Sequence, residues 1–143
     1  MVQITMSIAR VRHAEKLIAA LSHQLDTPLS LEENICALFD AHDHEMAIIE
    51  FDMNSDLIAV HRRILAPSDV EDKTCREMLR LNADQTRLSG CWLALDTQNA
   101  LRLMSTETLS LLNESRFCNH VIGFMDVANE VTALPMVTGT RHV

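Results

Sequence analysis

The densest group of side chains that could do chemistry is the polar run Asp40-Ala41-His42-Asp43-His44-Glu45. Imidazole and carboxylate groups are ligands for Zn²⁺ and similar divalent ions. The run separates apolar segments, so we expect a hairpin turn whose side chains point mostly into solvent. No distant Cys or His is specified to complete a coordination shell. We therefore interpret it as a solvated turn without a metal; a small metal-dependent enzyme using His42 and His44 is the alternative.

The cysteines and glycines offer no further catalytic arrangement. Four cysteines stand singly in apolar segments, with no C-x-x-C pair, and we expect them to be buried free thiols: Cys36, Cys75, Cys91 and Cys118. The sequence contains no G-x-S-x-G, H-E-x-x-H or G-x-x-x-x-G-K motif, and with only 3 glycines it has no phosphate-binding loop. We expect no catalytic residues, no cofactor and no enzyme activity.

Composition narrows the class of protein further. The net charge is −8, from 20 acidic and 12 basic residues, which disfavours a nucleic-acid partner because phosphate contacts need basic clusters. No apolar run approaches the roughly 18 residues of a membrane span, so we expect a cytosolic protein with no membrane insertion. A chain of 143 residues fits one domain. We place it at residues 1–134, followed by a flexible tail at 135–143.

The first elements that position these residues are a helix and a group of strands. Apolar residues recur at intervals of three and four over Ile4–Leu25, which predicts an amphipathic helix with Leu17 at the flank of its apolar stripe. The helix should end near Asp26 to Pro28, because the residue before a proline is disfavoured in helical geometry. The segments 35–41, 46–53 and 57–65 then read as strands joined by short polar turns, which predicts an antiparallel meander.

The second half of the chain also reads as helices and grouped strands. Ser68-Asp69-Val70-Glu71 matches a capping box and predicts a helix from Ser68 to about Asp84. Residues 90–95 and 100–106 read as a hairpin, and a last helix should begin near Asn113. Grouped strands and helices favour an α+β fold, an antiparallel sheet of about five strands with three helices in the order α-βββ-α-ββ-α.

Four ordered segments carry a resemblance to a known family. They are LEENICAL at residues 31–38, AIIE at 47–50, SGCWLALD at 89–96 and LNESRF at 112–117. Together, within a small acidic chain, they resemble the class I type III secretion chaperones, the CesT and SycE group, over roughly residues 5 to 133.

The resemblance implies a bacterial cytoplasmic homodimer in which the middle helix makes much of the dimer contact. It implies a partner that is the extended, non-globular N-terminal segment of a secreted effector, kept soluble and competent for export. A secretion ATPase would release this cargo, with no hydrolysis on the chaperone. A binder of the same fold that sequesters a secretion regulator is the alternative.

Candidate contact residues follow from the apolar positions on these elements. We expect the effector to contact residues of the first helix, the second strand and the later hairpin: Leu17, Leu21, Ile48, Trp92 and Met104. The dimer contacts are expected on the middle helix, at Met78, Leu79 and Leu81. Trp92 is the only tryptophan, and aromatic side chains often anchor binding partners.

Overall fold

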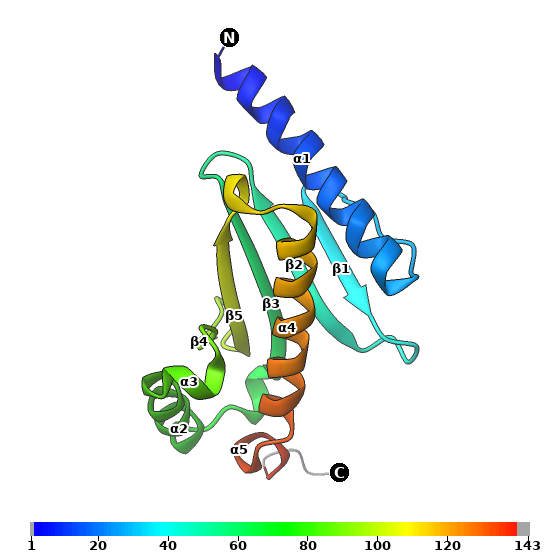
Figure 1. Cartoon of the computed structure of the whole chain (residues 1–143). Helices are drawn as coiled ribbons and strands as arrows, with labels where there is room; N and C mark the ends of the chain where they lie inside the picture. The colour runs from blue at the N-terminus through cyan, green and yellow to red at the C-terminus, as the bar shows by residue number, and fades with distance from the viewer. Residues whose placement is uncertain (1, 140–143) are drawn as a thin grey trace. The chain divides into compact units, whose positions relative to one another are not determined.

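The computed structural model describes residues 2–139, with side chains from residue 8 onward except at residue 85. The helices are α1 (Val2–Leu25), α2 (Asp72–Ala83), α3 (Gln85–Leu88), α4 (Glu114–Thr132) and α5 (Pro135–Thr138). The strands are β1 (Ile35–Phe39), β2 (Glu45–Asp52), β3 (Leu57–Leu65), β4 (Trp92–Leu95) and β5 (Leu101–Thr108). Two 3₁₀ turns, η1 (Pro67–Asp69) and η2 (Leu109–Leu111), connect them (Figure 1). The predicted α+β fold and element order are confirmed, with short helices added.

The five strands form one sheet in the order β1-β2-β3-β5-β4. β1 pairs antiparallel with β2 from Ile35↔Glu50 to Leu38↔Ala47, and a bulge follows between Leu38 and Phe39. β4 pairs antiparallel with β5, so that Trp92 lies opposite Met104. β1 and β4 are therefore the edge strands of the sheet.

The chain divides into two compact units, each built from separate stretches of sequence. The first unit comprises the chain up to Val60 together with Thr106–Gly123, and the second comprises His61–Ser105 together with the chain from Phe124 onward. The prediction of one domain over residues 1–134 stays a prediction.

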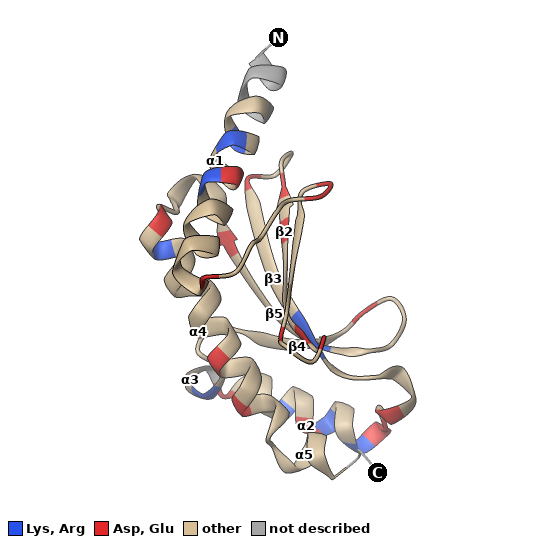
Figure 2. Cartoon of the chain, turned by 90° about the vertical axis from the view of Figure 1, so that its right-hand side faces the viewer, with Lys and Arg blue, Asp and Glu red and all other residues tan. Residues whose placement is uncertain are grey.

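The core of the first unit lies between α1, the start of α4 and one face of β1 and β2. Side chains that are buried on α1 are Ala14, Leu17, Ile18 and Leu21. Phe51 of β2 meets Phe117 of α4 with ring centroids 6.1 Å apart. Figure 2 shows α1 on one side of β2. Leu17 is completely buried, so its predicted place at the flank of the stripe was wrong.

In the second unit, the middle helix α2 begins later than predicted. Pro67–Asp69 forms η1, Val70 is extended, and α2 begins only at Asp72 with Glu71 as its N-cap. The Glu71 backbone N–H donates to Thr74 Oγ1 at 3.2 Å. Ser68 lies inside the 3₁₀ turn η1, so it precedes α2, although the sequence pattern had assigned it to the start of the helix.

The end of the chain also differs from expectation. We predicted a flexible tail from residue 135, but residues 135–138 form α5, in which Met136 and Val137 are buried. Pro135 suits the first turn of a helix because its missing N–H has no intrahelical partner there. Residues 140–143 of the predicted tail lie outside the described part of the chain.

Candidate functional site

The outward side of β1 and β2 carries an unusual number of apolar side chains. In β1, Cys36 and Leu38 point into the core, while alternation turns Ile35, Ala37 and Phe39 outward. Ile35 is 41% exposed and Phe39 is 56% exposed. The outward side of these two strands also carries the exposed acidic residues Glu50 and Asp52. We call the apolar residues on this side the apolar face: Ile35, Ala37, Phe39, Met46 and Ile48. Large exposed apolar groups that cluster in this way mark interaction surfaces.

Two grooves border the apolar face within the first unit. One, of about 670 Å³, lies beside the outer edge of β1 and is lined by Pro28, Leu29, Ser30, Glu32, Glu33, Ile35 and Ala37. The other, of about 680 Å³, surrounds the end of the β1–β2 pair and includes Glu50, Leu57 and Ala59. Both grooves combine apolar side chains with carboxylates. Such surfaces favour an apolar partner that also carries positive charge.

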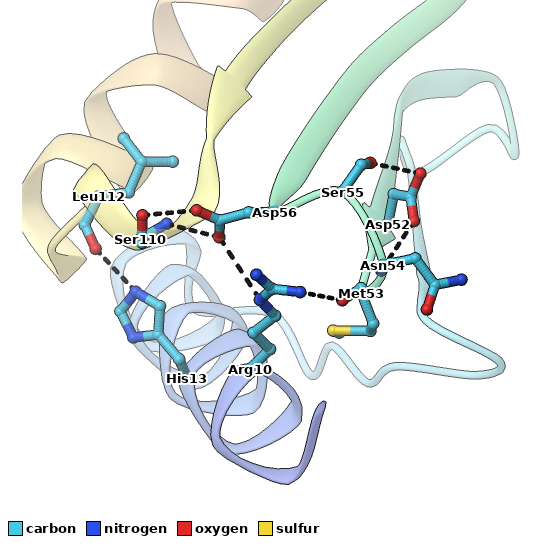
Figure 3. Close-up of polar contacts among 9 residues, drawn as sticks. All are labelled: Arg10, His13, Asp52, Met53, Asn54, Ser55, Asp56, Ser110 and Leu112. Carbon is cyan, nitrogen blue, oxygen red and sulfur yellow. Dashed lines mark hydrogen bonds and ion pairs between the residues drawn. The ribbon is translucent and has the colours of Figure 1, made fainter. Parts of the chain in front are cut away.

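The α1 helix is fixed to the β2–β3 turn by a group of polar contacts, which Figure 3 shows. The Arg10 guanidinium on α1 donates to the Met53 backbone oxygen, and its Nε lies 3.8 Å from Asp56 Oδ1. Asp56 also accepts the Ser110 backbone N–H at 3.0 Å and the Ser110 hydroxyl at 2.5 Å. We call Arg10, Asp56 and Ser110 the clasp, because they join α1, the β2–β3 turn and η2.

Further polar contacts complete the support of this region. His13 on α1 lies with Nε2 2.9 Å from the Leu112 backbone oxygen. In the β2–β3 turn, Asp52 accepts the Asn54 N–H at 3.0 Å and the Ser55 hydroxyl at 2.6 Å. These hydrogen bonds lower the pKa of the Asp52 carboxyl below its usual range. The polar groups therefore have structural partners and show no arrangement of nucleophile and base.

Among the predicted effector contacts, Leu17 and Leu21 require correction. Both side chains are 0% exposed, so an extended partner has no access to them in the folded protein. Apolar periodicity identifies the buried face of a helix and does not by itself identify a groove. Ile48, by contrast, is half-buried on the apolar face opposite Ala37.

The predicted contacts on the later hairpin lie side by side in the second unit. Trp92 of β4 and Met104 of β5 are Cα partners, so their side chains point to the same face of the sheet. Trp92 is 38% exposed, while Met104 is half-buried. Whether an effector contacts Trp92, Met104 or Ile48 stays a prediction.

The predicted dimer residues on α2 differ in accessibility. Leu79 is 64% exposed, Leu81 is half-buried, and Met78 is buried. Met78 is therefore mainly a core residue of its own chain. Leu79 is the predicted dimer residue that offers most surface to a second copy.

Ile35 and Phe39 were missed as candidate binding residues. The signal was present in the sequence, because all five residues of Ile35–Phe39 are apolar. A strand with only one buried face usually alternates apolar and polar residues. Apolar residues at the outward positions of an edge strand therefore indicate either that both faces of the strand are buried or that the outward face binds a partner.

The histidine turn and the thiols show no catalytic arrangement in the described residues. His44 Nδ1 lies 3.2 Å from Asp40 Oδ2, and both residues are at the surface. Residues 2–139 contain no group of three or more His, Cys, Asp or Glu side chains placed to hold a metal ion. Burial raises the pKa of the Cys36 thiol to about 11, which keeps it protonated and weakly nucleophilic. Cys118 is also buried, but Cys75 and Cys91 are only half-buried, unlike the prediction.

No helix within the described part of the chain is long and apolar enough to cross a membrane. The described residues thus combine an α+β fold, an accessible apolar sheet face and acidic grooves along an edge strand. Proteins that bind extended polypeptide use exposed sheet edges and apolar pockets of this kind.

The sequence places the chain within one family of that class. Residues 16–132 match the Tir chaperone protein (CesT) family, and the chain belongs to this family. It is a class I type III secretion chaperone, as the sequence resemblance indicated. No similar sequence was found among curated proteins.

Solved structures share the fold at low sequence identity. A chain of the HopA1–SchA chaperone–effector complex is 12% identical, with a TM-score of 0.71; the match covers 89% of this chain and 98% of that one. A chain of the ExsC–ExsE complex is 15% identical, with a TM-score of 0.70 and coverage of 84% and 91%. The chaperone SycH of Yersinia pestis, in complex with a stable fragment of YscM2, is similar at 13% identity, with a TM-score of 0.59 and coverage of 82% and 98%.

Proposed function

We propose that this chaperone binds the extended N-terminal segment of a secreted effector on the apolar face and keeps that segment soluble and competent for export. The observation that carries the proposal is the exposure of Ile35 and Phe39 on an edge strand of a chain that belongs to the Tir chaperone protein family. A surface of this kind holds an unfolded segment through side-chain pockets and backbone hydrogen bonds.

The physical requirements of such binding agree with the surface. Ordering an extended segment costs conformational entropy, so a long contact with several apolar anchors is needed. The grooves of about 670 and 680 Å³ extend the contact on either side of Ile35. Their carboxylates, together with the net charge of −8, favour effector segments with basic residues between the apolar ones.

The working unit is a homodimer in the bacterial cytoplasm, with Leu79 of α2 at the contact between subunits. Leu79 is exposed in the single chain, and burial of its side chain against a second copy of the chain stabilises the dimer. The protein acts by binding alone and catalyses no reaction. Release of the effector falls to the secretion ATPase.

Co-expression with candidate effector N-terminal fragments tests this function. The tagged chaperone should copurify with one fragment, and Phe39→Asp should weaken capture at least about tenfold because a charge replaces an apolar anchor. Leu111→Asp is the matched control, since Leu111 is 68% exposed but belongs to η2 and not to the two strands that form the apolar face. Circular dichroism should show both variants folded.

Two outcomes would overturn the proposal. One is failure of the wild-type protein to capture any effector fragment. The other is equal loss of capture in the Phe39→Asp and Leu111→Asp variants, which would show that the apolar face has no special part in binding. Identification of the captured partner also separates an exported effector from a regulator that stays in the cytoplasm.

A further inference from the structure

The sheet has two edge strands, β1 and β4, and their outward backbone groups decide how copies of the chain can meet. An edge strand turns the N–H and C=O of every second residue outward, where a strand of another molecule can pair with them. If both edges were open, β4 of one copy could pair with β1 of the next copy. Head-to-tail contacts of this kind build rings or open-ended filaments instead of a closed dimer.

The edge at β1 is closed by its own chain at the first residue of the strand. The Phe51 N–H donates to the Asn34 oxygen at 2.9 Å, and alternation from that pair turns the backbones of Ile35 and Ala37 outward. Ile35 exchanges two backbone hydrogen bonds with Glu32, at 2.9 and 3.0 Å. Ala37 is the next outward residue along the edge.

The rest of the β1 edge is open. The Asp40 N–H donates to the His44 oxygen at 2.9 Å, so the pair after the bulge is directed inward and the backbone of Phe39 is turned outward. In the described part of the chain, no other element takes the outward backbone groups of Ala37 and Phe39. Both side chains are apolar, and Phe39 is 56% exposed. β1 could therefore pair with the edge strand of a second copy.

The edge at β4 has the same apolar character. Trp92 is 38% exposed and Leu95 is 40% exposed. The Asp96 N–H donates to the Ala100 oxygen at 3.0 Å across the β4–β5 turn, and alternation from this pair turns the backbones of Leu93 and Leu95 outward. Two successive outward residues would be enough to begin a ladder with β1 of another copy.

The Asn82 side chain takes both outward groups of Leu93. The Leu93 N–H donates to Asn82 Oδ1 at 2.8 Å, and Asn82 Nδ2 donates to the Leu93 oxygen at 2.9 Å. A primary amide has an acceptor side and a donor side, as the peptide groups of an added strand have. Asn82 lies near the end of α2, which packs against β4 within the second unit.

The residues on either side of Leu93 complete the comparison. The Cys91 N–H donates to the Leu88 oxygen at 2.9 Å. Of the outward residues between Cys91 and Leu95, these contacts leave Leu95 open. One open residue gives an added strand a single site of pairing, whereas a ladder needs successive ones.

We propose that Asn82 closes the β4 edge to strand β1 of a second copy of this chain and so prevents the chaperone from joining sheet to sheet into open-ended assemblies. The excluded partner is β1 because it combines open backbone groups with apolar side chains. Asn82 is thus a specificity-determining residue for self-association. The inference concerns contacts between copies of the chain and holds whether or not an effector is bound.

Hydrogen exchange of individual backbone amides in dilute solution tests the contact itself. In the wild-type protein the Leu93 amide should exchange slowly although it lies on an edge strand. Asn82→Ala should raise its exchange rate about tenfold or more by removing the acceptor. Asn82→Asp should keep most of the protection, since a carboxylate still accepts from the Leu93 N–H. Arg80→Ala, an exposed change on the same helix, is the control and should leave the rate unchanged.

Light scattering over a range of protein concentrations tests the consequence for self-association. The wild-type protein should keep one mass, whereas the mass of Asn82→Ala should rise with concentration, at least about twofold, as copies join head to tail. Asn82→Leu keeps the side-chain volume without any hydrogen-bonding group and should behave in the same way. This second variant separates the open edge from a loss of packing between α2 and β4.

Proline substitutions identify the edges that join. Proline is tolerated on an edge strand where the N–H points outward, and it removes the donor that an added strand needs. In the Asn82→Ala background, Ala37→Pro on β1 and Leu95→Pro on β4 should each restore the mass of the wild-type protein. Circular dichroism should show that all these variants are folded.

Three results would overturn the inference. Unchanged exchange at Leu93 in Asn82→Ala would show that the amide does not protect the edge. Faster exchange with an unchanged mass at every concentration would show that an open β4 does not pair with a second copy. Larger assemblies that persist with both Ala37→Pro and Leu95→Pro would show that copies join elsewhere. Capture of an effector is measured separately, so its failure would contradict the proposed function and leave these outcomes decisive.

Discussion

Asp56 is the residue on which the clasp depends. Its carboxylate accepts two hydrogen bonds from Ser110 and lies 3.8 Å from the Arg10 guanidinium. Asp56→Ala should lower the free energy of unfolding by roughly 2 kcal/mol, because the Ser110 groups lose a charged acceptor. Urea unfolding followed by circular dichroism measures this change.

A double-mutant cycle separates the clasp from a general effect of removing charge. Asp56→Ala and Ser110→Ala should be non-additive, with a coupling of about 1 kcal/mol, since they remove the same contacts. Asp126→Ala, an exposed carboxylate on α4, should change stability little. Additive effects of the Asp56 and Ser110 changes would contradict the clasp.

Leu17 belongs to the core of the first unit. Its side chain is 0% exposed, so Leu17→Ala should destabilise the protein by roughly 2 to 5 kcal/mol through lost burial and a cavity. Ile8→Ala, at a side chain 50% exposed on the same helix, is the control and should cost less than about 1 kcal/mol. Chemical unfolding gives both values. Weaker effector capture by Leu17→Ala at unchanged stability would restore its predicted binding role.

Single residues also show which parts of the site the sequence could predict. Ile48 is half-buried and Trp92 is 38% exposed, so both are partly accessible, and their contact with an effector stays a prediction. Leu17 and Leu21 were misplaced because a groove residue and a core residue have the same apolar side chain and helical spacing. The amide of Asn82 was invisible to sequence patterns, since its partner is the backbone of Leu93, eleven residues away.

At the scale of elements, α2 offers the clearest test of assembly. Leu79 is 64% exposed, so Leu79→Glu should place a charge in the proposed dimer contact and leave the fold intact. Light scattering after size exclusion should report a monomer of 16.1 kDa in place of a dimer of twice that mass. Arg76→Ala, exposed on the same helix, should remain dimeric. A monomeric wild-type protein, or a Leu79→Glu dimer, would contradict the contact.

The elements themselves were largely predictable, because periodicity reflects which faces are buried. α1 ends at Leu25, and β3 occupies Leu57–Leu65, as expected. Asn113 precedes α4, and its Oδ1 accepts the Arg116 N–H at 2.8 Å. The predicted start of α2 was wrong. Ser68 and Glu71 have the residue types of a capping box, but the turn that begins at Pro67 makes Glu71, and not Ser68, the N-cap of the helix.

At the scale of the whole molecule, neither compact unit is a continuous stretch of sequence. The chain passes from one unit to the other after Val60, after Ser105 and after Gly123. The first two crossings lie within strands β3 and β5, and the third lies within α4. Unfolding one unit alone would require these elements to break partway along their length. Regular hydrogen-bonded elements resist such a break because their formation is cooperative.

We therefore expect the two units to unfold together. Trp92, the only tryptophan, lies in the second unit, so its fluorescence reports on that unit, whereas far-ultraviolet circular dichroism reports on helices of both. The two signals should give the same midpoint and the same slope in urea, as for one cooperative domain. A fluorescence transition at lower urea than the circular dichroism transition would show that the second unit unfolds independently and would contradict the prediction of one domain over residues 1–134.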